Sequence, residues 1–120
     1  MLIRYKKTFE KIAMGLLSFM PDEKDVKRLS HTIKEYEINP DWQLYLWKEE
    51  ELLGAIGIRL EENNKVVIQH ISVNPSYRRQ GIGKKMIKAI YEKYGEEHVI
   101  CANENTEGFV NKCMPVDEKR

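Results

Sequence analysis

The spacing of hydrophobic residues changes twice along this chain and divides it into three regions. In the first region, apolar residues recur every three or four positions over Thr8–Met20 and Asp22–Asn39, which predicts two amphipathic helices with Thr8 and Asp22 as their N-caps. In the second region, apolar and polar residues alternate in three short runs separated by charged or polar turns, as expected for an antiparallel meander. The predicted strands of this meander are Trp42–Trp47, Leu52–Leu60 and Lys65–Val73.

Helical spacing returns in the third region. Apolar residues from Ile82 to Tyr94 mark the buried face of a helix that Gly95 ends. The other predicted elements are a strand over His98–Ala102, a helical piece over Thr106–Cys113 and a first strand over Leu2–Tyr5, with a loose tail over Pro115–Arg120. The order βααβββαβα is typical of an α/β domain, and we expect residues 1–120 to form one such domain.

Composition limits the classes of protein to which this chain can belong. With 120 residues, of which 42% are hydrophobic, it has the size of one ordinary domain with a single core. Its 20 Lys and Arg residues against 19 Asp and Glu give a net charge of +1, which excludes a general attraction to nucleic acid or anionic membranes. Two cysteines are too few for a disulfide framework, and no apolar stretch reaches the ~18 residues of a membrane span, so we expect a cytoplasmic protein.

The turn between the third meander strand and the next helix combines glycines with positive charges. The first N–H groups of a helix lack intrahelical partners and carry partial positive charge, and glycine lets an anion approach the backbone closely. A basic glycine turn that opens a helix therefore predicts a phosphate-binding site. The turn reads Arg78-Arg79-Gln80-Gly81-Ile82-Gly83-Lys84-Lys85.

Two common phosphate motifs do not fit this turn. A dinucleotide-binding G-x-G-x-x-G motif needs a third glycine where this chain has Met86, and it follows a strand of a βαβ unit rather than of a meander. A P-loop needs a first glycine where Arg78 stands and a hydroxyl residue for Mg²⁺ where Lys85 stands. Both alternatives therefore fail at specific positions.

The remaining pattern, R-x-x-G-x-G shortly after V-x-P, resembles the acetyl-CoA signature of the GNAT acetyltransferases. The match comprises Arg78, Gly81 and Gly83, and the order of elements resembles that of the family from Leu2 to Cys113. The resemblance implies a mixed, mostly antiparallel central sheet with helices on both faces. It also implies an acetyl-CoA-dependent N-acetyltransferase that acts on an amine.

The resemblance further implies a bulge in the strand Lys65–Val73, which separates this strand from the last one. The pantetheine arm of acetyl-CoA would enter the gap like an added strand, and backbone groups of Ile71 and Val73 would bind it. The pyrophosphate would lie on the glycine turn. The residues assigned to acetyl-CoA in this way are Ile71, Ser72, Val73, Arg78, Arg79, Gln80, Gly81, Ile82, Gly83, Lys84, Asn103, Asn105 and Phe109.

The catalytic groups follow less directly from the sequence. Many GNAT proteins protonate the leaving thiolate with a tyrosine in the fourth helix, but the corresponding residue here is Val110, which has no proton to donate. Cys113 is one candidate substitute, and an ordinary buried thiol is the alternative. His70 is the candidate base because histidine is the residue type whose unperturbed side chain changes charge near neutral pH; alternatively it is a structural cross-strand residue. Strict alternation places His70 on the strand face of Val66, Ile68 and Ser72.

Three expectations concern the protein's context. Family members continue after the fourth helix into two more strands, whereas only residues 114–120 remain here, so we expect an uncovered sheet edge and a homodimer. The segments Leu2–Lys7, Phe9–Pro21 and His70–Pro75 together resemble small GNAT proteins encoded with riboflavin-synthesis genes, which implies a link to flavin metabolism. Val110 also leaves open a non-catalytic acyl-CoA-binding or regulatory protein. Nucleic-acid binding is less favoured, since no aromatic RNA motif accompanies the cations.

Overall fold

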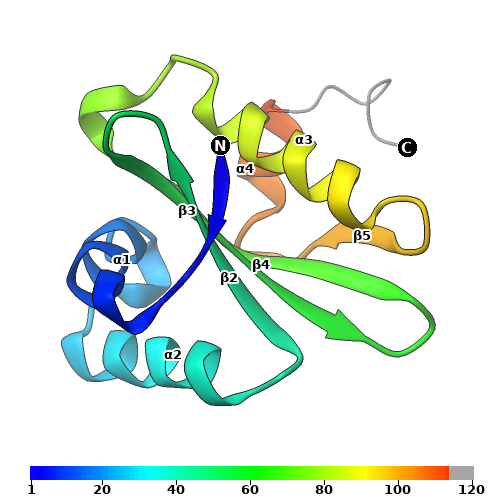
Figure 1. Ribbon diagram of the computed structural model, residues 1–120, viewed down its shortest axis with the longest axis horizontal. Helices are drawn as coiled ribbons and strands as arrows, with labels where there is room; N and C mark the ends of the chain where they lie inside the picture. Colours follow the sequence, from blue (N-terminus) through cyan, green and yellow to red (C-terminus); the bar gives the residue numbers. More distant parts are fainter. Residues whose placement is uncertain (114–120) are drawn as a thin grey trace.

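A computed structural model of the chain describes residues 1–113, apart from the side chains of Asp22 and Cys113. It contains a five-stranded sheet in the order β1-β2-β3-β4-β5, with α1 and α2 on one face and α3 and α4 on the other (Figure 1). The strands are β1 Leu2–Arg4, β2 Trp42–Lys48, β3 Leu52–Glu61, β4 Lys65–Val73 and β5 Val99–Ala102. The helices are η1 Lys7–Phe9, α1 Glu10–Leu17, η2 Pro21–Glu23, α2 Val26–Ile38, η3 Pro75–Tyr77, α3 Ile82–Tyr94 and α4 Glu107–Cys113.

The sheet is mixed and mostly antiparallel, which confirms the predicted fold class. Strands β1 to β4 pair antiparallel in sequence order, while β5 returns through α3 and pairs parallel with β4. Such a return requires a crossover connection, and α3 supplies it. Strand β5 has no second strand partner among residues 1–113, so the expected pairing with another chain stays a prediction. The tail Pro115–Arg120 lies outside the described residues.

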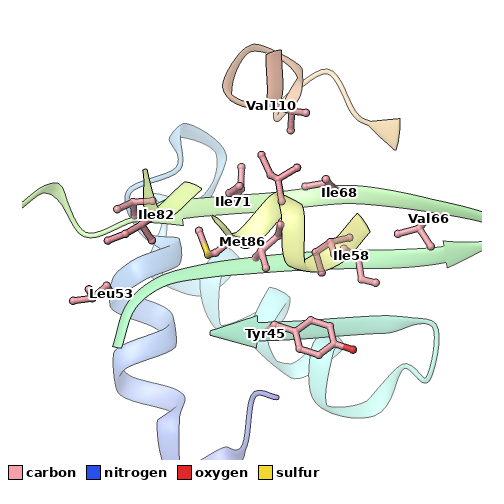
Figure 2. Packing of buried hydrophobic residues seen from close by; sticks show 13 residues of the cluster. Tyr45, Leu53, Ile58, Val66, Ile68, Ile71, Ile82, Met86 and Val110 are labelled. Carbon is pink, nitrogen blue, oxygen red and sulfur yellow. The ribbon is translucent and has the colours of Figure 1, made fainter. Parts of the chain in front are cut away.

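Each face of the sheet buries its own apolar cluster. Under α3 and α4 lie the residues drawn in Figure 2, where Met86 and Ile82 of α3 and Val110 of α4 point toward the strands. Burying an aliphatic side chain of this kind contributes about 1.5–3 kcal/mol, so α3 is held mainly by its apolar face. Under α1 and α2 lie Ala13, Leu16, Leu17, Leu29, Ile33, Tyr36, Leu44, Leu46 and Ala55. No helix within residues 1–113 is long and apolar enough to cross a membrane.

The first two helices begin later than the sequence predicts. Thr8 lies in a 3₁₀ turn rather than at an N-cap, and α1 starts at Glu10 without a side-chain cap. A second 3₁₀ turn starts at Pro21, and the chain becomes extended at Asp25 before α2 begins. The carboxylate of Asp25 accepts a hydrogen bond from the Lys27 N–H at 2.8 Å, so this residue is the N-cap. The prediction of Asp22 as N-cap was wrong by one turn.

Strand β4 contains the bulge that the family resemblance implies. Gly57 of β3 faces His70, but the next residue of β3 faces Ile68, so Gln69 has no partner of its own. An extra residue reverses the alternation of side chains beyond it. Val66 and Ile68 therefore lie in the cluster under α3, whereas His70 lies on the face of α1 and α2. The prediction that His70 shares a face with Val66 and Ile68 was wrong for this reason, whereas Ser72 does lie on the face of His70.

Candidate functional site

The bulge separates β4 from β5. Strand β5 pairs with β4 only from Lys65 to Ile68. The hydroxyl of Thr106, just before α4, donates a hydrogen bond to the Ile68 carbonyl at 2.7 Å, and the Asn103 N–H donates to the same carbonyl at 3.4 Å. These contacts stabilise the point at which the two strands separate. Within residues 1–113, the rest of β4 has no strand beside it on this edge.

The backbone groups along this open edge can be assigned from the β3–β4 ladder. The Asn74 N–H donates to the Leu53 carbonyl at 2.8 Å, so residue 74 points its backbone groups toward β3. Because these groups alternate along an antiparallel strand, Ser72 also points toward β3, while Ile71 and Val73 point away from it. The N–H and C=O groups of Ile71 and Val73 therefore face the gap, as the binding of an extended amide-bearing arm requires.

The glycine turn leads from this edge into α3. Arg79 has φ 67° and Gly81 has φ 77°, so the backbone twice enters the left-handed region. Alternation of right- and left-handed residues turns successive N–H groups toward one side and makes a concave anion site. Among the described residues, no side chain caps the N-terminus of α3, which begins directly after Gly81. Its first N–H groups are thus directed at whatever occupies this concavity.

A groove of about 750 Å³ lies over the turn. It is bounded by the end of β4, the N-terminus of α3 and one side of α4. Its charged residues are all cationic among the described residues that line it. The lining comprises Val73, Tyr77, Arg78, Arg79, Gly81, Ile82, Gly83, Lys84, Phe109 and Lys112. A volume of this size and charge suits a phosphorylated ligand larger than a free phosphate.

Most of the residues expected to bind the cofactor line this groove, but several have other positions. Ser72 turns away, because its hydroxyl donates to the Leu16 carbonyl of α1. Asn103 uses its side-chain oxygen to accept from the N–H groups of Asn105 and Thr106, which shapes the turn before α4. Gln80 and Asn105 are exposed, and neither lines the groove.

Two residues of the groove were missed by the sequence analysis. Tyr77 precedes the motif by one position, and its hydroxyl donates to the Glu51 carboxylate at 3.0 Å. Lys112 lies three residues after Phe109, so the two share a face of α4. The helical spacing from Phe109 was a signal that could have identified Lys112. No sequence pattern singled out Tyr77.

His70 is not free to act alone, because both nitrogens of its ring are hydrogen-bonded. Nδ1 lies 2.6 Å from the Tyr36 hydroxyl of α2, and Nε2 lies 3.2 Å from a carboxylate oxygen of Glu23 in η2. Gln69 donates to the same Tyr36 hydroxyl at 3.1 Å, and Thr32 donates to Glu23 at 2.9 Å. These side chains are nearly all buried. They form one network beneath the bulge of β4.

The geometry of groove and open edge agrees with the comparison of this chain to known proteins. The model of the acetyltransferase (GNAT) family matches residues 11–113. An uncharacterized N-acetyltransferase in the lysA 3′ region of Bacillus methanolicus is 60% identical over 114 residues, which cover 94% of each chain. The chain belongs to the GNAT acetyltransferase family. It is therefore an acetyl-CoA-dependent N-acetyltransferase.

Solved structures show the same fold. The aminoglycoside acetyltransferase AAC(6′)-Iy, in complex with the bisubstrate analog CoA-S-monomethyl-acetylneamine, matches with a TM-score of 0.74 at 17% identity, over 100% of this chain and 92% of that one. A GNAT-family acetyltransferase from Staphylococcus aureus Mu50 matches with a TM-score of 0.69 at 20% identity, over 93% and 77%. The Bacillus methanolicus relative is described by its position near lysA, which gives no support to the expected link with riboflavin synthesis.

In this GNAT protein the fourth helix presents no hydroxyl at the expected position. Val110 is 6% exposed and packs in the cluster under α3 and α4, pointing toward β4 (Figure 2). Its neighbour Phe109 is half-buried and lines the groove. The other candidate acid, Cys113, has a side chain outside the described residues. Because Val110 has no proton to donate, the leaving thiolate must take up its proton from a group other than this side chain or from water.

The buried carboxyl of Glu23 is held in its charged form. Burial alone raises its pKa, but hydrogen bonds from His70 and Thr32 and nearby positive charge, including that of Arg28, outweigh burial and place the pKa below its ordinary value of 4.5. Arg28 lies 3.6 Å from the carboxylate and is itself largely exposed. Glu23 is thus an ionised carboxylate whose remaining hydrogen-bonding capacity is met by protein groups.

This shift predicts how stability depends on pH. A carboxyl with a depressed folded-state pKa stabilises the protein above its ordinary value of 4.5 and loses this contribution as the pH falls through the folded-state pKa. The stability difference between the wild type and Glu23→Gln should therefore be larger at pH 7 than at pH 3, as measured by urea unfolding. Glu62→Gln, at an exposed turn, should follow the wild type at both pH values. An equal Glu23→Gln deficit at both would contradict the assignment.

Proposed function

We propose that the groove binds the pyrophosphate of acetyl-CoA on the turn from Arg79 to Lys84 and that the pantetheine arm runs along the open edge of β4. The observation that carries this proposal is the continuity of two features. The cationic groove ends at Val73, and Val73 is also the residue where the open backbone edge begins. Phosphate recognition and amide recognition thus lie end to end, in the order in which the two groups occur in the cofactor.

Arg78 stabilises the junction between the groove and the open edge of β4. Its side chain donates to the Val73 carbonyl at 3.4 Å and lies 6.0 Å from the ring of Phe19. Phe19, two residues after the end of α1, is 43% exposed, so it presents an accessible aromatic surface next to Arg78. Arg78 thereby adds positive charge near the site proposed for the pyrophosphate and holds the end of β4.

The proposed reaction is direct transfer within a ternary complex. An unprotonated amine attacks the thioester carbonyl, the C–S bond breaks, and coenzyme A leaves as a thiolate that takes up a proton, while the amine gives up one. A backbone N–H on the open edge of β4 would polarise the carbonyl and stabilise the developing oxyanion. With Val110 at the usual acid position, water is the proposed proton source for the thiolate.

For the acceptor we propose a small-molecule amine. One similar solved structure contains an aminoglycoside-derived bisubstrate analog, and this supports a soluble amine over a protein side chain only as an analogy of fold. A flavin precursor remains an acceptor to be tested, because the expected link to riboflavin synthesis rests on sequence resemblance alone.

The test is a screen for amine-dependent release of coenzyme A. The wild type would be incubated with acetyl-CoA and polyamines, amino acids, aminoglycosides, lysine peptides or amine-bearing flavin precursors, and free thiol would be measured. We expect release with at least one amine class and an acetylated product of matching mass. Tight binding of acetyl-CoA with no release of coenzyme A for any amine class would instead favour the non-catalytic acyl-CoA-binding alternative. The missing hydroxyl at Val110 is the observation that supports this alternative.

A further inference from the structure

The buried network beneath β4 can be read as one directed chain of hydrogen bonds. Arg59 donates to the Gln69 side-chain oxygen at 3.3 Å, and the Gln69 amide donates to the Tyr36 hydroxyl. The Tyr36 hydroxyl therefore has its proton left for Nδ1 of His70, and Nε2 of His70 donates to Glu23. In this arrangement every polar atom of the chain has a partner.

This chain ties two distant parts of the protein to the bulge. Tyr36 is in the last turn of α2, and Glu23 is in the turn between α1 and α2. The two residues of β4 that they hold, Gln69 and His70, are the residues that make the bulge. A bulge is an irregularity that the ladder alone does not favour, so side-chain bonds on both of its residues define where it forms.

The space that this network occupies depends on the missing side chain of Gly57. Gly57 faces His70 across the sheet, and a Cβ at Gly57 would lie 2.0 Å from the Tyr36 hydroxyl. The ring of Tyr36 is further held edge-on against Trp42, with centroids 5.0 Å apart. The fixed ring of Tyr36 thus places its hydroxyl beside the bulge, in space that only a glycine at position 57 leaves open.

We propose that Tyr36 and Glu23, acting through Gln69 and His70, are positioning residues for acetyl transfer. This inference rests on the proposed function. The bulge reverses the alternation of β4 and so decides that Ile71 and Val73 turn their backbone groups to the gap, where the arm and thioester would bind. The network fixes the bulge, and the bulge fixes these groups. His70 then acts by holding the backbone, because both its ring nitrogens are already bonded within the protein.

A purely structural role for the same network makes a different prediction. In that case, loss of the Tyr36 hydroxyl lowers stability but leaves the folded protein's affinity and turnover unchanged. A positioning role predicts a selective loss for ligands that carry the arm. ADP has the pyrophosphate but no arm, so it reports on the glycine turn alone, whereas acetyl-CoA reports on both.

The experiment compares Tyr36→Phe with a matched control, Tyr5→Phe. Tyr5 also donates its hydroxyl to a residue of α2, Glu37, at 2.7 Å, but it lies at the other edge of the sheet from β4. Affinities for acetyl-CoA and ADP would be measured by calorimetry well below each variant's melting temperature. We expect Tyr36→Phe to weaken acetyl-CoA binding roughly tenfold, to leave ADP binding unchanged, and to lower kcat for an accepted amine up to about 100-fold. Tyr5→Phe should leave all three unchanged.

Glu23→Gln is the second variant, and it still tests the inference if Tyr36→Phe is poorly folded. It removes the charge but keeps a side-chain oxygen for Thr32, so its effects should have the same pattern at smaller size. The double variant should lose no more acetyl-CoA affinity than Tyr36→Phe alone, since residues that act as one unit are not additive. The inference would be overturned if Tyr36→Phe bound acetyl-CoA as tightly as Tyr5→Phe does, with the ADP affinities of the two variants also equal. Failure of the wild type to bind either ligand would instead overturn the proposed function on which it rests.

Discussion

The Gly81→Glu variant should still fold, with the cost of about 1–2 kcal/mol of any non-glycine residue at φ 77°, and should lose coenzyme A affinity by roughly 100-fold, because a carboxylate would occupy the position proposed for the pyrophosphate. A Cβ at Gly81 would have no atom within 4 Å, so the added side chain meets no packed protein, and Gly81 itself lines the groove. The loss would come from repulsion between like charges and from blocked N–H groups at the start of α3. Calorimetric titration of coenzyme A measures it directly.

Two further glycine variants separate the sources of this loss. Gly81→Ala adds no charge, and its cost is the strain of a non-glycine residue at φ 77°, about 1–2 kcal/mol of stability. It should therefore lower the melting temperature more than the affinity. Gly15→Glu adds the same charge at an exposed, open position of α1 and should bind coenzyme A like the wild type. Unchanged affinity in Gly81→Glu would refute the placement of the pyrophosphate.

Replacing Gly57 by alanine should be the most destabilising small substitution in the sheet. The new Cβ would lie 2.0 Å from the Tyr36 hydroxyl and 2.5 Å from the ring carbon that bears it, and Tyr36 is held by Trp42 and the polar network. Overpacking and a broken buried network together cost roughly 3 kcal/mol. A urea unfolding curve should show this loss as a lower midpoint with little change in slope.

The control for Gly57→Ala is the same substitution at Gly15. Gly15 lies within α1, where a Cβ meets nothing within 4 Å and alanine favours the helix by about 0.5–1 kcal/mol. The two substitutions differ only in place, yet we expect opposite signs of the stability change. A Gly57→Ala protein as stable as the wild type would show that Tyr36 can leave its site, and the packing described for the network would then be wrong.

The elements and the glycine turn were predictable because their signals are local. Hydrophobic spacing of 3.6 or 2 residues identifies a helix or a strand within about a dozen positions, and it indicated each helix and strand in the correct order. The glycine turn was likewise complete within a few residues, and its comparison with other phosphate motifs required only the identity of Arg78, Lys85 and Met86. Helix starts were less accurate, since short 3₁₀ turns and the true cap at Asp25 differ little from their neighbours in composition.

The face of His70 and the partners of Glu23 depended on the tertiary structure, whereas the open edge of β4 was expected from the family resemblance and not from the residues themselves. One extra residue in β4 reversed the alternation from which the face of His70 was predicted, and no residue type at that position marks a bulge. Glu23 and His70 are 47 positions apart, so only the packing of the α1–α2 turn on the sheet brings them together. The pattern of neighbouring residues determines whether a segment forms a helix or a strand, because the interactions that favour either structure are local. Which buried polar groups meet is decided by how the segments pack, because burial leaves each of them only the partners that the fold supplies.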